Sequence, residues 1–107
     1  MQITINNITW EIIFTNDIND LTLNNGNSTL GLTDLSSKTI YLYYNLRGPL
    51  LRRVLMHEIT HAFIFSYNYY LTLSEEEFIC SFIDTYADNI IDDTNYILSN
   101  YFNTMVL

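Results

Sequence analysis

Basic residues are scarce in this sequence of 107 residues, which has four of them against twelve acidic residues and a formal net charge of −8. Nucleic-acid binding requires a basic surface that meets the phosphates, so we expect no nucleic-acid partner. An anionic membrane surface is disfavoured for the same reason. The sequence also lacks any run of 18 or more apolar residues, so we expect no membrane-spanning helix.

Cysteine is scarcer still. Cys80 is the only one, which excludes an internal disulfide and suits a reducing compartment. The first seven residues have neither the basic start nor the apolar stretch of a secretory signal. We therefore expect a cytoplasmic protein. With 49% apolar and only 15% charged residues, the chain is not disordered, and its length fits one domain over residues 1–107.

The first half of the sequence has the pattern of strands. Apolar residues alternate along residues 8–14, and β-branched and aromatic residues dominate residues 39–44. A shorter strand is expected over residues 29–33. Residues 24–28 and 34–38 have the Asn, Gly, Asp and Ser content of turns. These segments predict a small, mainly antiparallel sheet.

The second half has the pattern of helices, so the predicted fold class is α+β. Pro49 suits the first turn of a helix, and apolar residues at helical spacing predict one long helix over residues 49–66. A second helix with its own apolar stripe is expected from about Thr72. Both helices are expected to pack with the sheet.

A third, short helix is expected over residues 95–105. The run Asp92-Asp93-Thr94 has the composition of a helix break followed by a new N-cap. The apolar side chains after it are expected to point inward, namely Ile97, Leu98, Tyr101, Phe102 and Met105.

Residues 57–61 read His-Glu-Ile-Thr-His, in the middle of the predicted long helix. Positions i and i+4 of a helix lie one turn apart on one face, so His57 and His61 can direct two imidazoles at one metal ion. Glu58 lies about 100° further around the helix, where it can reach a water on the metal. This is why the H-E-x-x-H pattern serves zinc peptidases. Both histidines of the chain are in the motif.

A catalytic zinc ion keeps three protein ligands and one open position, and the sequence has no third histidine. Two possible capping boxes, Thr72 with Glu75 and Ser74 with Glu77, compete with metal binding for the carboxylates. From the residues alone, Glu76 and Glu77 both remain open as the third ligand. A lone helical cysteine more often packs as a small hydrophobe than binds a metal. The full set of candidate donors on the second helix is Glu75, Glu76, Glu77, Asp84, Asp88 and Cys80.

The segments Val54–Ala62 and Glu76–Ile83 resemble the minimal gluzincin peptidases, which include the ImmA/IrrE-like peptidases and the stand-alone minigluzincins. In these families a short antiparallel sheet precedes the H-E-x-x-H helix, and a second helix carries a ligand glutamate. The resemblance extends over nearly the whole chain, although only the two helix motifs are specific. It implies that Glu77, three residues before Cys80, is the third zinc ligand.

One position departs from the family pattern. Gluzincins commonly carry Asp or Asn four residues after the ligand glutamate, where it orients a metal-bound histidine, and this chain has Ser81 there. A hydroxyl holds an imidazole more weakly than a carboxylate does, so Asp84 or Asp88 would have to substitute. The resemblance also implies a latent form in which residues 96–107 cover the site. The simpler expectation is that this segment completes the core.

Three functions fit these observations. The first is a zinc-dependent endopeptidase with one Zn²⁺ per chain, Glu58 as general base, and a peptide or protein substrate. Because ImmA-like relatives cut one regulator protein, the resemblance implies a narrow specificity. The second is a non-catalytic, zinc-stabilised interaction module of phage or mobile-element origin, and the third is a metal-free binding protein. Glu58 favours the first, since a structural zinc site has no use for a carboxylate beside the metal.

Overall fold

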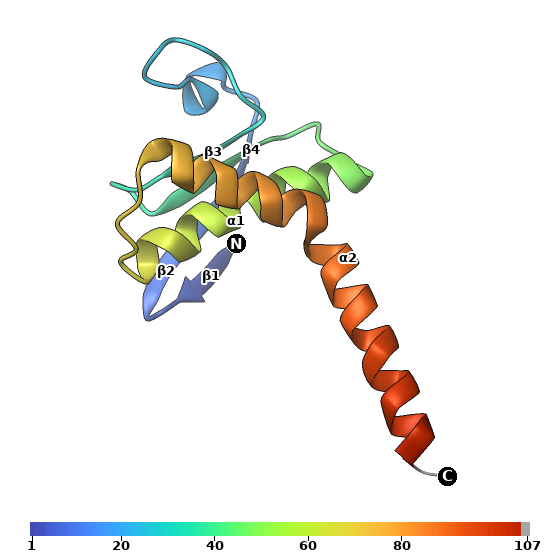
Figure 1. Cartoon of the computed structure of the whole chain (residues 1–107). Coiled ribbons are helices and arrows are strands. Elements are labelled where there is room, and N and C mark those ends of the chain that lie inside the picture. Colours follow the sequence, from blue (N-terminus) through green and yellow to red (C-terminus); the bar gives the residue numbers. More distant parts are fainter. Residues whose placement is uncertain (106–107) are drawn as a thin grey trace.

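The computed structural model describes residues 1–105, with Met105 described by its backbone alone, and the structure is α+β as expected. Four strands form one sheet: β1 (Gln2–Ile5), β2 (Ile8–Thr15), β3 (Gly31–Asp34) and β4 (Thr39–Tyr43). A 3-10 helix, η1 (Ile18–Leu21), follows β2. Helix α1 (Gly48–Ser66) lies against the sheet, and α2 (Leu73–Met105) runs beside α1 and then projects beyond the body (Figure 1).

The sheet has the strand order β1-β2-β4-β3. Its two outer pairs are antiparallel, as expected, whereas the central pair of β2 and β4 is parallel. Parallel neighbours require a crossover connection, and here that connection carries η1 and β3. As a result β3 lies at the edge of the sheet, where it packs against α1.

Strand β1 has no counterpart among the strands predicted from the sequence. It pairs with β2 through a two-residue turn in which Asn6 and Asn7 both have positive φ, at 49° and 64°. A two-residue hairpin turn with positive φ at both central positions matches the twist of the strands, and asparagine tolerates this backbone conformation.

The core lies between the sheet and α1, and Trp10 is its largest fully buried side chain. Its indole Nε1 donates a hydrogen bond to Ser66 Oγ at 2.9 Å, and Asn6 Nδ2 donates to the Ser66 carbonyl at 2.8 Å. These two bonds tie the C-terminal end of α1 to the β1–β2 hairpin. The other members of the buried cluster are Ile5, Ile12, Ile40, Leu42, Leu46 and Ala62.

Helix α1 confirms the prediction for residues 49–66, but the predicted break at 92–94 and the third helix are wrong, because α2 is continuous over this region. Thr94 acts as an interior helical residue whose Oγ1 donates to the Ile90 carbonyl at 2.7 Å. The apolar side chains expected to point inward are exposed instead, namely Ile97, Leu98, Tyr101 and Phe102.

The described part of the C-terminal segment neither completes the core nor covers the histidines, because it points away from the body (Figure 1). The side chain of Met105 and residues 106–107 lie outside the described part of the chain. No described helix combines the length and the apolar composition needed to cross a membrane.

Replacing Ser66 with alanine should destabilise the protein by about 1–3 kcal/mol, because the buried Trp10 Nε1 would lose its only hydrogen-bond acceptor. Chemical denaturation followed by Trp10 fluorescence measures this. Ser99→Ala, at an exposed position of α2, is the matched control and should change the free energy of unfolding by less than about 0.5 kcal/mol. Equal effects of the two variants would contradict the assignment.

Candidate metal centre

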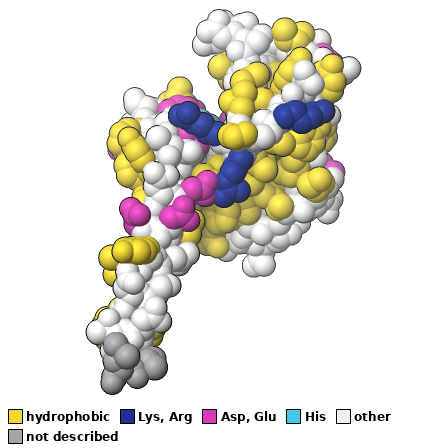
Figure 2. Space-filling view, turned by 90° about the vertical axis from the view of Figure 1, so that its right-hand side faces the viewer, with side chains coloured by type: hydrophobic (Ala, Val, Ile, Leu, Met, Phe, Trp, Pro, Cys, Tyr) yellow, Lys and Arg dark blue, Asp and Glu magenta, His cyan; other side chains and the backbone are white. Residues whose placement is uncertain are grey.

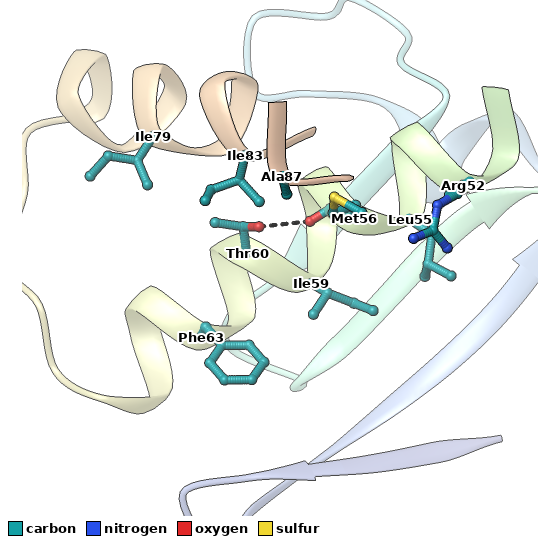
Figure 3. Close-up of a pocket in the computed structure, with 9 residues that line it drawn as sticks. All are labelled: Arg52, Leu55, Met56, Ile59, Thr60, Phe63, Ile79, Ile83 and Ala87. Carbon is teal, nitrogen blue, oxygen red and sulfur yellow. Dashed lines mark hydrogen bonds between the residues drawn. The ribbon is translucent and has the colours of Figure 1, made fainter. Parts of the chain in front are cut away.

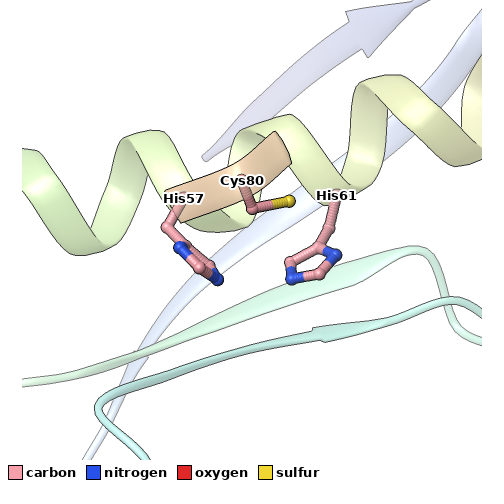
Figure 4. A group of neighbouring side chains, drawn as sticks. All are labelled: His57, His61 and Cys80. Carbon is pink, nitrogen blue, oxygen red and sulfur yellow. The ribbon is translucent and has the colours of Figure 1, made fainter. Parts of the chain in front are cut away.

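His57 and His61 lie on one face of α1, with ring centroids 5.1 Å apart and ring planes inclined by 66° (Figure 4). Both side chains are largely buried, at 19% and 12% exposed. The opposite face of α1 packs on the sheet, so the helix presents the two imidazoles toward α2 rather than toward the core.

The Glu77 carboxylate of α2 faces both imidazoles. Its Oε2 lies 3.3 Å from His57 Nε2, and its Oε1 lies 3.0 Å from His61 Nε2. Two nitrogen lone pairs would repel a carboxylate at these distances, so the arrangement requires positive charge between them, either as protons on the rings or as a cation. The structure thus brings together the three residues proposed from the sequence as metal ligands.

The start of α2 explains why Glu77 is available. Thr72 and Glu75 form the capping box, in which Thr72 N donates to Glu75 Oε1 at 2.9 Å and Glu75 N donates to Thr72 Oγ1 at 3.2 Å. Ser74 therefore lies inside the helix and is not the cap. Because Glu75 serves the cap, Glu77 is left to face the histidines.

The other nitrogen of each ring is also held by a carboxylate. His57 Nδ1 lies 2.7 Å from Asp84 Oδ2, and His61 Nδ1 lies 2.8 Å from Glu76 Oε1. A carboxylate accepts from Nδ1–H, which fixes the tautomer and leaves Nε2 free to bind a metal. Glu76 is therefore placed to orient His61 and not to share its Nε2 with Glu77.

Asp84 takes the orienting position for which the sequence leaves Asp84 and Asp88 open, while Ser81 is exposed. Arg53 Nε donates to Asp84 Oδ1 at 3.0 Å. Burial acts to raise the pKa of Asp84, but hydrogen bonds from His57, Arg53 and Thr85 outweigh it and leave the pKa lowered. Asp84 thus stays ionised beside His57.

Asp88 lies one turn further along and pairs with Arg52 through two contacts, at 2.7 and 2.8 Å. The sequence alone gives no reason to pair Arg52 and Arg53 with these two aspartates.

Cys80 is fully buried beside the two histidines, and its Sγ and one nitrogen of each ring lie within 4.8 Å of one another (Figure 4). Burial, with the nearby carboxylates of Glu77 and Glu76, raises the pKa of the thiol to about 12. Zinc binds the thiolate, so metal binding by Cys80 would require the loss of this proton. Its position fits the packing role expected for it.

Glu58 points toward β3. Thr33 Oγ1 donates to Glu58 Oε1 at 3.0 Å, and Glu58 is only 7% exposed. Burial raises the pKa of Glu58, with opposition from His61, Thr33 and His57. Sequence reasoning missed Thr33, since no local pattern links a strand threonine to a helix 25 residues away.

Gly31 allows β3 to lie this close to α1. A Cβ at this position would be 2.7 Å from Val54 Cγ1 and 2.9 Å from Glu58 Cγ, so any side chain would force the strand and the helix apart. Beside this contact lies a cavity of about 310 Å³ that is lined by both His57 and Glu58. The carboxylate and the imidazole thus share one solvent-accessible space.

No protein-family model, no curated protein and no solved structure matches this chain. The site is therefore interpreted from its own geometry.

Replacing Asp84 with alanine should weaken zinc binding roughly 10–100-fold, because the imidazole of His57 would lose the carboxylate that orients it. Competition with a zinc-binding dye measures the affinity. Asp88→Ala is the matched control, since Asp88 contacts Arg52 in an exposed pair. If both variants bind zinc as the parent chain does, Asp84 does not orient a metal ligand.

Proposed function

We propose that this chain is a zinc-dependent endopeptidase whose metal is held by His57, His61 and Glu77. The proposal depends above all on one observation, that both Nε2 atoms face the Glu77 carboxylate at 3.3 and 3.0 Å. Two imidazole nitrogens and one carboxylate are a donor set of catalytic zinc sites, which keep a fourth position open. The resemblance of the two helix motifs to minimal gluzincins supports the same reading.

A bound zinc ion would supply Lewis acidity toward a carbonyl oxygen and would lower the pKa of a coordinated water to about 7. The residues of the chain supply proton transfer. Glu58 accepts a proton from the attacking water as its oxygen bonds to the peptide carbonyl carbon, and it delivers the proton to the amine nitrogen as the C–N bond breaks. Burial raises the pKa of Glu58, which helps the carboxyl group to hold the proton between these two steps.

The substrate that fits this site is an extended segment of a peptide or protein. Strand β3 pairs only with β4 among the described strands, so its other edge can add a strand of substrate by backbone hydrogen bonding. Leu30, Leu50 and Val54 line the adjoining cavity and suit an apolar side chain. Thr33 is on the same strand, so substrate pairing and the orientation of Glu58 depend on one element.

A non-catalytic zinc site is the second candidate, and the position of Cys80 favours it. A structural site closes its fourth position with a protein ligand, and Cys80 lies close enough to both histidines to be considered. In that case His57, His61, Glu77 and Cys80 would enclose the ion, and no water could reach it.

Replacing Glu58 with glutamine should abolish peptide cleavage while one zinc ion per chain is retained, because the amide cannot accept the proton. Zinc content and cleavage of a peptide library measure the two properties. With zinc removed from both proteins, the Glu58→Gln variant should also melt at a higher temperature than the parent at neutral pH, since the variant no longer buries a carboxylate whose pKa is raised. Cleavage at the parental rate would exclude Glu58 as the base.

Replacing Glu77 with alanine should remove most of the bound zinc, because only two protein ligands would remain. Cys80→Ser, which replaces a single atom in the same part of α2, should retain both zinc and cleavage. Zinc analysis after dialysis measures this. Loss of zinc from Cys80→Ser, with retention in Glu77→Ala, would instead support the closed structural site.

A further inference from the structure

Helix α2 extends well past the helix on which it packs. It has 33 residues and α1 has 19, a difference of 33 − 19 = 14 residues, or about 21 Å of helix. All residues from 88 to 104 are exposed. A single helix of this length is marginally stable in water, since helices in proteins owe most of their stability to the packing of one face.

The face of α2 that meets α1 continues along this projecting segment, defined here as residues 89–105. Beside α1 it lines an apolar groove of about 550 Å³, with Leu55, Ile59 and Phe63 on α1 and Ile79, Ile83 and Ala87 on α2 (Figure 3). The apolar residues that follow on this face recur at helical spacings of four and seven. They are Ile90, Ile91, Ile97, Leu98, Tyr101 and Phe102, all between 46% and 63% exposed.

This continuation indicates a helix-packing surface. A stripe of exposed apolar side chains on one face of a helix marks an interaction site. Its spacing is that of a face which packs on another helix, as the same face does on α1 within the body. We therefore expect the partner of this surface to be a helix.

The charges of the segment indicate which partner fits. Residues 94–105 contain no charged residue, and the nearest acidic groups are Asp88, Asp92 and Asp93. Figure 2 shows acidic side chains on the projecting helix only near the body. Two copies of a chain with net charge −8 repel each other, and this segment is where they can approach with the least repulsion. The segment has no lysine or arginine to favour an anionic membrane.

The same charges favour an antiparallel over a parallel arrangement of the two helices. A parallel pair would bring Asp92 and Asp93 of the two copies together and set the two acidic bodies side by side. An antiparallel pair places the bodies at opposite ends and opposes the two helix dipoles. Centred between Ser99 and Asn100, it pairs the uncharged residues 94–105 of the two copies and sets Ile97 opposite Phe102 and Leu98 opposite Tyr101, while Ile90 and Ile91 lie outside the pair.

We propose that the projecting segment of α2 pairs in antiparallel fashion with the same segment of a second copy, forming a two-fold symmetric dimer. Such an interface is isologous, because each copy contributes the same residues. His57, His61 and Glu77 lie on the body, so both candidate metal centres remain accessible in the dimer.

The mass of the full chain in solution tests the dimer. Sedimentation or light scattering should give twice 12.6 kDa for the parent chain, and 12.6 kDa for a variant with Leu98→Asp and Tyr101→Asp. The matched control carries the same two charges on the polar face, as Ser99→Asp and Asn103→Asp, and should remain a dimer. Fluorescence of the buried Trp10 reports whether the body stays folded. A monomeric parent chain, or a dimeric stripe variant, would overturn the proposal.

Disulfide trapping tests the direction. Ile97→Cys and Phe102→Cys should each form little crosslinked dimer alone, whereas their equimolar mixture should form it readily under mild oxidation. The native Cys80 is buried in the body and does not compete. Crosslinking of each variant with itself, and none between them, would mean a parallel pair and overturn the antiparallel arrangement.

Discussion

Two imidazole rings held among three carboxylates are the constraint around which the helices are arranged. Glu77 faces both Nε2 atoms, while Asp84 and Glu76 hold the two Nδ1 atoms. Such a concentration of negative charge is stable only with positive charge at its centre. The contact between α1 and α2 is therefore as much an electrostatic assembly as an apolar one. The protons or the cation that supply this positive charge therefore also contribute to the stability of the contact between α2 and α1.

Much of the fold and the centre of the site could be predicted from the sequence. Periodicity predicted β2, β4 and α1, and the spacing of His57 and His61 placed both rings on one face. The resemblance selected Glu77, which lies beside both rings. Strand β1 was missed although a signal was present, since Asn6-Asn7 lies between alternating apolar residues and has the composition of a hairpin turn.

Other features could not be predicted, because no local pattern encodes them. The bond from Thr33 to Glu58 depends on how the edge strand lies over α1, which only the assembled fold determines. The break predicted at Asp92-Asp93-Thr94 rested on local capping chemistry, whereas the apolar pairs on its two sides, Ile90-Ile91 and Ile97-Leu98, are seven residues apart and so share one helix face. The prediction of inward side chains after this point assumed that the segment packs on the body, whereas α2 continues beyond it.

The capping box at the start of α2 sets the rotational phase of everything that follows it. Glu76, Glu77 and Asp84 face the histidines because Thr72 and Glu75 fix where the helix begins. One extra residue between the cap and Glu76 would turn all three carboxylates by about 100° while the helix itself stayed intact. This junction can therefore vary in composition during evolution far more easily than in length. An insertion or deletion here would turn the three carboxylates away from the histidines although every side chain of the site is still present.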